Sequence, residues 1–192
     1  MTPALWRYAV AMLCSALAHA ALSEGASAPD IRATASLAGK AFDYSLAQNL
    51  RKGPVVVYFY PSAFTQGCNL EAHTFATRID DFAAAGASVV GVSLDGIERL
   101  NAFSADPDYC AGRLAVASDA NGSIARAYQL NVRDTPAGRK DTRGNEIDHG
   151  LAERTTFVVG VDGRIVASLG GLNPVQNVER ALEVVQGLAH AK

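Results

Sequence analysis

The run from Val55 to Tyr60 constrains the fold more than any other feature of the chain. Its apolar and β-prone residues lie between Pro54 and Pro61, which predicts a strand buried on both faces, as in an α/β sheet. Thr65 and Cys68 follow in the spacing Pro-x-x-x-Thr-x-x-Cys. Because a helix is expected to begin there, its positive dipole end would favour a thiolate at the cysteine. The stretch is typical of a cysteine-based redox or nucleophilic enzyme.

The rest of the chain alternates between strand and helix patterns. Strands are expected over 55–60, 89–94, 114–117, 155–161 and 164–169, and helices over 70–85, 97–104, 124–130 and 175–188. A weak hairpin is expected over 33–44, one or two helical turns over 44–52, a flexible lead-in over 22–30, and a long polar loop over 133–150. Alternation that closes with a hairpin predicts an α/β fold, with a central mixed sheet and helices on both faces. This order is compatible with a thioredoxin-like fold.

Residues 1–20 have the pattern of a secretory signal peptide. Arg7 gives a positive start, an apolar stretch follows, and Ala18-His19-Ala20 fits the rule for a cleavage site. We therefore expect a mature domain over residues 21–192, periplasmic or secreted, with cleavage after Ala20. There are two alternatives: the segment stays uncleaved as a membrane anchor, or cleavage occurs after Ala28.

Charge and cysteine content limit the functional classes that remain. The net charge is −2, so no positive footprint for nucleic acid is present. Cys14 falls in the predicted signal, which leaves Cys68 and Cys110 in the mature chain. An exported protein enters a compartment that permits disulfides, so one structural disulfide between these cysteines is an alternative to a catalytic role.

Four residues are candidates for the chemistry, and each has a plain structural alternative. Cys68 could instead be a buried inert thiol, and the Thr65 hydroxyl could cap the helix rather than serve the sulfur. Pro61 could shield the sulfur or only end the strand. Arg154 stands directly before the strand expected at 155. Its permanent charge could supply the cation that a thiolate needs, or could simply be solvated.

These residues resemble a known family. PSAFTQGC resembles the active-site motif of peroxiredoxins, and YFYPSAFTQGCNLEAHTF is similar to the bacterioferritin-comigratory, or peroxiredoxin Q, branch. Arg-Thr-Thr-Phe at 154–157 looks like the second active-site element of that family. The resemblance implies a thioredoxin-like fold and a peroxidase without metal or organic cofactor. Cys68 would attack a hydroperoxide and become a sulfenic acid, Thr65 and Arg154 would hold the peroxide oxygens, and Pro61 would shield the sulfur.

The chain departs from that branch in its second cysteine. Many members carry a resolving cysteine five residues after the first, where this chain has His73. Cys110 is the remaining candidate, and an atypical two-cysteine cycle with local unwinding is the hypothesis. A one-cysteine cycle resolved by an external thiol, or a static disulfide, are alternatives. The resemblance further implies a thioredoxin-like or other thiol reductant as partner, and a monomer or weak dimer.

Two rival classes share the expected fold. A thioredoxin-type disulfide oxidoreductase would have Cys-x-x-Cys, whereas Asn69-Leu70-Glu71 follows Cys68. A copper-binding assembly factor would have a close cysteine pair and a distant histidine. Only Cys68 is present at that site, with His149 in the polar loop, and thiolate-imidazole sites normally need more ligands.

Overall fold

The computed structural model describes residues 21–190. The predicted signal peptide, residues 1–20, lies outside the described residues. Within them, no helix is both long enough and apolar enough to cross a membrane.

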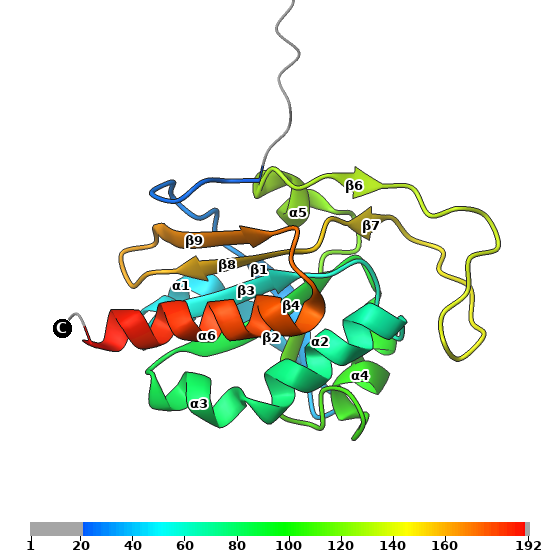
Figure 1. Cartoon of the computed structure of the whole chain (residues 1–192). Coiled ribbons are helices and arrows are strands. Elements are labelled where there is room, and N and C mark those ends of the chain that lie inside the picture. The colour runs from blue at the N-terminus through cyan, green and yellow to red at the C-terminus, as the bar shows by residue number, and fades with distance from the viewer. Residues whose placement is uncertain (1–20, 191–192) are drawn as a thin grey trace, which may run out of the picture.

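A mixed sheet of seven strands forms the centre of the domain (Figure 1). Its strands, in spatial order, are β2 (Lys40–Ser45), β1 (Arg32–Leu37), β5 (Ala115–Ser118), β4 (Ser88–Ser93), β3 (Val55–Phe59), β8 (Thr155–Val159) and β9 (Ile165–Gly170). The three central strands β5, β4 and β3 run parallel, and their outer neighbours pair antiparallel. The predicted mixed sheet and its closing hairpin are confirmed.

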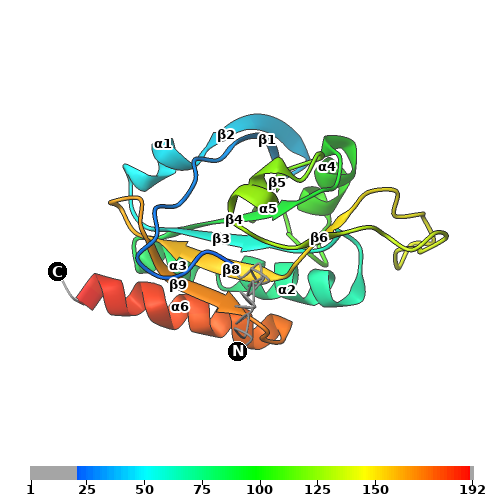
Figure 2. The same ribbon diagram turned by 90° about the horizontal axis from the view of Figure 1, so that it is seen from above.

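Helices cover both faces of this sheet, as predicted. One face packs against α2 (Gln66–Thr77), α3 (Ile79–Ala84), α4 (Ile97–Ala105) and α6 (Pro174–His190), and the other against α1 (Leu46–Leu50) and α5 (Ser123–Ala127). Figure 1 shows α2, α3, α4 and α6 on one side of the sheet and α5 on the other, and Figure 2 shows the same layers from above.

Strand β3 is buried on both faces, which explains its continuous apolar sequence. Val56 and Tyr58 face the core under α2 and α6, whereas Val55, Val57 and Phe59 face the opposite core. The Tyr58 ring lies against Gly91 of β4, where an added Cβ would fall 2.5 Å from Tyr58 Cζ. The absence of a side chain at Gly91 therefore makes room for this buried ring.

The prediction of a single helix over 70–85 is wrong at the start of the helix and in its middle. The helix begins at Gln66, and it is interrupted at Arg78, where φ is −102° and ψ is 7°. Thr74 and Thr77 direct their hydroxyls to backbone carbonyls of the preceding turn, which competes with regular helix geometry. Asp81 pairs with Arg78 and lies in the first turn of the second segment, α3.

The lead-in at 22–30 is not the flexible segment that its composition predicts. The backbone N–H groups of Leu22, Gly25 and Ala28 donate to the carbonyls of Tyr128, Ile165 and Gly163. These bonds hold the segment against the β8–β9 hairpin and the end of α5.

The long polar loop predicted over 133–150 is present between two short paired strands. These are β6 (Val132–Arg133) and β7 (Leu151–Ala152), which form a separate antiparallel ribbon. The connecting loop, residues 134–150, projects from the body of the domain in both views (Figure 1, Figure 2). Its base stands beside the end of β3, where the candidate site lies.

Candidate functional site

Cys68 lies in the first turn of α2, just beyond the end of β3. The intervening loop ends at Thr65, which has extended backbone angles and whose carbonyl accepts from the Asn69 N–H at 2.8 Å. The cysteine is 2% exposed. Its sulfur therefore sits at the positive end of the helix dipole, with little access to bulk water.

Thr65 occupies the helix N-cap position, but its hydroxyl does not cap the helix. Thr65 Oγ1 donates to the Ser62 carbonyl at 2.8 Å. This bond fixes the loop before α2 and leaves the lone pairs of Oγ1 as acceptors.

Arg154 is brought to Cys68 by the pairing of β8 with β3. The register pairs Phe59 with Thr155, so Arg154 stands beside the end of β3, where the loop to α2 starts. Its Nη2 donates to Cys68 Sγ at 3.3 Å. A hydrogen bond from a permanent cation stabilises negative charge on the sulfur. Arg154 is therefore not simply a solvated arginine at a strand end, which was the structural alternative.

Glu71 completes this cluster and was not predicted as a site residue. Its carboxylate pairs with Arg154 Nη1 and accepts from Asn177 Nδ2 of α6, the latter at 2.8 Å. The side chain is fully buried, and burial raises the pKa of Glu71 to about 7 against the lowering effects of Arg154 and Asn177. The sequence signal that could have identified Glu71 is its position three residues after Cys68, on the same helix face.

Pro61 lies between the buried strand and the cysteine loop, and it lines the cavity beside Arg154. This cavity has a volume of about 570 Å³. Its remaining lining residues are Arg133 and Ala152 of the β6–β7 ribbon and the adjoining Asn131 and Glu153. The cavity thus leads from the surface to two of the residues predicted to flank the sulfur.

Cys110 lies in the turn between α4 and β5, fully buried and free. Burial and, to a lesser degree, the charge of Asp106 raise the pKa of its thiol. The turn is held to α2 by His73, whose Nδ1 donates to the Asp108 carbonyl at 3.0 Å. His73 is exposed, and this hydrogen bond directs its ring to the turn. The two cysteines are not joined in this structure, so a static disulfide does not describe it.

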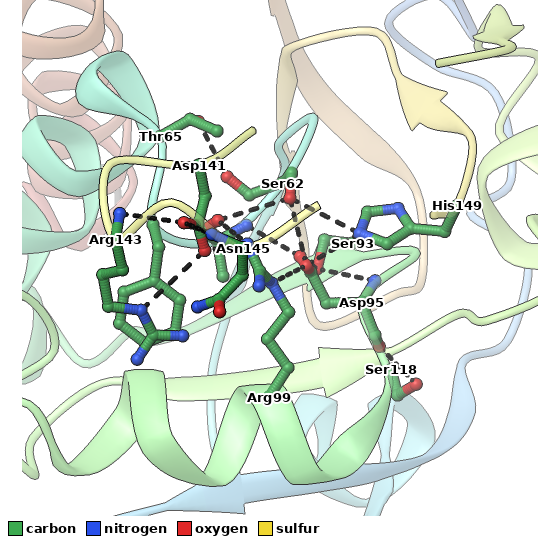
Figure 3. Close-up of polar contacts among 12 residues, drawn as sticks. Ser62, Thr65, Ser93, Asp95, Arg99, Ser118, Asp141, Arg143, Asn145 and His149 are labelled. Atoms are coloured by element: carbon green, nitrogen blue, oxygen red, sulfur yellow. Dashed lines mark hydrogen bonds and ion pairs between the residues drawn. The ribbon is translucent and has the colours of Figure 1, made fainter. Parts of the chain in front are cut away.

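A buried polar network supports the loop that carries Pro61 to Thr65 (Figure 3). Asp95, which is fully buried after β4, accepts from the Ala63 N–H at 2.7 Å and from Arg99 Nε at 2.8 Å. His149 Nε2 donates to the same carboxylate at 2.8 Å, and its Nδ1 donates to the Gly150 carbonyl. Ser62 also donates to Asp95. The polar loop is thus tied to the loop before α2.

Both ring nitrogens of His149 face acceptors, so the imidazolium form fits the site. Burial lowers the pKa of His149, but the hydrogen bond and charge of Asp95 outweigh it and the pKa is raised. Burial raises the pKa of Asp95, and its hydrogen bonds with His149, Ala63 and Ser93 bring it below its usual range. No ring nitrogen is left to act as a base toward Ser62, so this group is structural rather than a serine-type catalytic triad.

A second set of contacts anchors the polar loop on Phe64. The backbone N–H and the hydroxyl of Thr142 both donate to the Phe64 carbonyl at 2.8 Å. Arg99 Nη2 donates to the Ala63 carbonyl and forms an ion pair with Asp141 at 2.8 Å. Phe64 has a φ of 58°, which costs a non-glycine residue free energy. The loop therefore holds the residue before Thr65 in an otherwise unfavourable conformation.

The ligand set for a copper-binding site is not assembled. His149 is engaged with Asp95, and no group of three or more histidine, cysteine, aspartate or glutamate side chains among residues 21–190 is placed to hold a metal ion.

Comparison with known proteins agrees with this geometry. The AhpC/TSA family matches residues 25–168. A Mycobacterium tuberculosis protein described as a peroxiredoxin is 35% identical over 114 residues, which are 59% of this chain and 66% of that protein. Peroxiredoxin Bcp of Xanthomonas campestris is 27% identical over 138 residues, 72% of this chain and 78% of that protein.

The fold is also that of solved peroxiredoxins. The crystal structure of peroxidoxin BcpB from Mycobacterium tuberculosis superposes with a TM-score of 0.72 at 24% identity, covering 87% of this chain and 98% of that chain. The bacterioferritin comigratory protein of Xanthomonas campestris gives a TM-score of 0.65 at 22% identity, covering 83% and 92%. The thioredoxin-like fold is thereby confirmed. The chain belongs to the AhpC/TSA family, and its relatives and structural neighbours include peroxiredoxins of the bacterioferritin-comigratory type.

Proposed function

We propose that the protein is a thiol-dependent peroxidase whose nucleophile is Cys68. The contact of Arg154 Nη2 with Cys68 Sγ at 3.3 Å carries the proposal. The thiolate attacks the terminal oxygen of a hydroperoxide, the S–O bond forms as the O–O bond breaks, and the sulfur becomes a sulfenic acid. The departing alkoxide, or hydroxide from hydrogen peroxide, leaves with the electron pair and takes up one proton from solvent to give the alcohol or water.

The surrounding residues supply electrostatic stabilisation and exclude water. Arg154 stabilises the negative charge first on sulfur and then on the departing oxygen. The Thr65 hydroxyl, fixed at the helix start, accepts a hydrogen bond from the hydroperoxide O–H, and Pro61 limits the approach of water and bulky thiols. Glu71 and Asn177 orient the guanidinium. The thiolate and the peroxide supply all the electrons of this step, and solvent supplies the one proton.

Peroxide consumption tests the assignment of the nucleophile. With a thiol reductant in excess, the wild type should remove hydrogen peroxide catalytically. Cys68→Ser should remove it no faster than the reductant does without the protein. The control is Ser88→Ala, a similarly small change at an exposed residue at the start of β4 that leaves the sulfur and its loop in place. Turnover by Cys68→Ser would contradict the proposal.

For the second step we propose that Cys110 resolves the sulfenic acid. Cys110 is the other cysteine among the described residues, its turn is joined to α2 by the His73 hydrogen bond, and both cysteines belong to one core cluster. Both thiols are buried, so the start of α2 and the turn must open locally before the sulfurs meet. Resolution by an external thiol is the alternative.

Intact mass separates these two cycles. After one equivalent of peroxide, the wild type should lose two hydrogens as a disulfide forms, whereas Cys110→Ser should gain one oxygen. Accumulation of an oxygen adduct in the wild type, with no loss of two hydrogens, would favour the one-cysteine cycle.

We further propose export, on the signal pattern at residues 1–20. The reductant would then be a thioredoxin-like protein outside the cytoplasm, and the enzyme a monomer or weak dimer. An N-terminus at Ala21 in the periplasmic fraction would support export, and retention in the cytoplasm with Met1 intact would refute it. Sedimentation tests the oligomeric state.

A further inference from the structure

The cavity beside Arg154 is much larger than hydrogen peroxide requires. Its volume is about 570 Å³, within the range of sites that bind small organic ligands and far above the roughly 30 Å³ that one water molecule occupies. Arg154 forms part of its wall and contacts Cys68 Sγ. A hydroperoxide that approaches Arg154 through this cavity therefore has room for a carbon substituent.

The wall is polar, which limits the kind of substituent. Pro61 and Ala152 are its apolar members, and the others are Asn131, Arg133, Glu153 and Arg154. A large apolar chain or ring would leave these polar groups without water and without partners, which costs free energy. The wall fits a substituent that carries a polar group of its own.

Arg133 is the cavity-wall residue whose guanidinium has no partner among the described residues. Its side chain forms no hydrogen bond or ion pair with any residue between 21 and 190, whereas the guanidinium of Arg154 is engaged by Cys68 and Glu71. Arg133 lies on β6 opposite Leu151 of β7, so the ribbon fixes the position of its backbone. A guanidinium with free donors matches a carboxylate, which it can bind through two parallel hydrogen bonds.

Glu153 is the opposing charge on this wall. Its Oε2 accepts from the Asn131 N–H at 3.4 Å, and no ion pair joins it to Arg133. A carboxylate bound at Arg133 would be repelled by Glu153, so removal of each charge should change its binding in opposite directions.

We propose that this cavity binds organic hydroperoxides that carry a carboxylate, with Arg133 as the specificity-determining residue. The inference rests on the proposed peroxidase function of Cys68. The carboxylate pairs with Arg133 while the hydroperoxide group reaches Arg154 and Cys68. Chemistry at the sulfur is unchanged: the terminal oxygen is transferred, and the carboxylate-bearing alcohol leaves.

A matched pair of substrates tests the proposal. The rate of Cys68 oxidation in a single turnover is measured with cumene hydroperoxide and with its para-carboxylate derivative, and each rate is divided by that of the same variant with hydrogen peroxide. The wild type should favour the carboxylate by about tenfold, equivalent to about 1.4 kcal/mol. The preference should weaken as salt is added, because the pair is partly exposed.

Substitutions then assign the preference to Arg133. Arg133→Gln should abolish it, Arg133→Lys should retain part of it, and Glu153→Gln should increase it. The control is Arg51→Gln, which removes an exposed arginine at the end of α1 and should keep the wild-type ratio. Equal ratios in the wild type and Arg133→Gln would overturn the proposal. Failure of hydrogen peroxide itself to oxidise Cys68 would instead overturn the peroxidase assignment.

Discussion

Replacing Arg154 with methionine removes the cation that joins Cys68 to Glu71, and it should change both the rate and the stability of the protein. Methionine is unbranched and apolar, so it fills similar space without a donor. Loss of one donor to a developing negative charge typically slows an enzyme by about 10²–10³ in turnover. We expect a decrease of this size in the rate at which hydrogen peroxide oxidises Cys68.

The stability of the variant should depend on pH in a way that the wild type does not. Glu71 is fully buried, and its pKa of about 7 already lies above the usual range. A carboxyl with a raised pKa in the fold contributes stability that is present below its unfolded pKa and is lost as pH rises through its folded pKa. For the wild type this loss ends near pH 7.

Without Arg154, burial acts on Glu71 with only Asn177 opposing it, so the folded pKa rises further. Stability should then keep falling above pH 7, by up to about 1.4 kcal/mol for each pH unit. Urea unfolding followed by circular dichroism at pH 6, 7, 8 and 9 measures this slope. The double variant Arg154→Met with Glu71→Gln should lose the added slope yet stay slow with peroxide.

Two outcomes would refute this reasoning. One is a free energy of unfolding for Arg154→Met that has the same pH dependence as the wild type above pH 7. The other is oxidation of Cys68 at close to the wild-type rate.

Two further predictions concern the packing and the polar loop. Gly91→Ala should destabilise the protein by about 1–3 kcal/mol, because the new Cβ would lie 2.5 Å from Tyr58 Cζ and the ring is stacked on Phe75; urea unfolding measures this. Gly187→Ala in α6 is the control: it meets no atom within 4 Å and should stabilise the helix by about 0.5–1 kcal/mol, so equal effects would contradict the packing argument. His149 has a raised pKa, so the stability from its charged contact with Asp95 should be present below the unfolded pKa and lost as pH rises through the folded one. An NMR titration of the His149 ring that gives the value of free imidazole or less would contradict this, and His149→Gln should lack the corresponding loss of stability.

Local sequence patterns were sufficient to predict the elements whose burial follows from their own residues. The run of β3 needs apolar residues on both faces, and Cys68 follows it at a helix start, so both were predicted from local pattern. Arg154 was predicted from its place before a strand, and the antiparallel register of β8 with β3 then brings it beside the cysteine loop. Local pattern and strand pairing are sufficient for these residues.

Residues whose partners lie far along the chain could not be predicted in this way. Glu71 is a charged residue on a helix and would ordinarily be solvated, but Asn177 of α6 and Arg154 enclose it. His149 and Asp95 are likewise separated by most of the polar loop and two strands, and only the folded chain brings them together. The interruption at Arg78 was missed because apolar spacing continues across it.

The site of the first oxidation shows whether Cys68 is the nucleophile that Arg154 activates. Cys110→Ser is treated with one equivalent of hydrogen peroxide, the sulfenic acid is trapped with a 1,3-dione, and the adduct is located by peptide mass spectrometry. We expect one adduct, on Cys68, and much less of it when Arg154→Met is added to Cys110→Ser. Absence of any adduct, or an adduct elsewhere while Cys68 stays a free thiol, would contradict it.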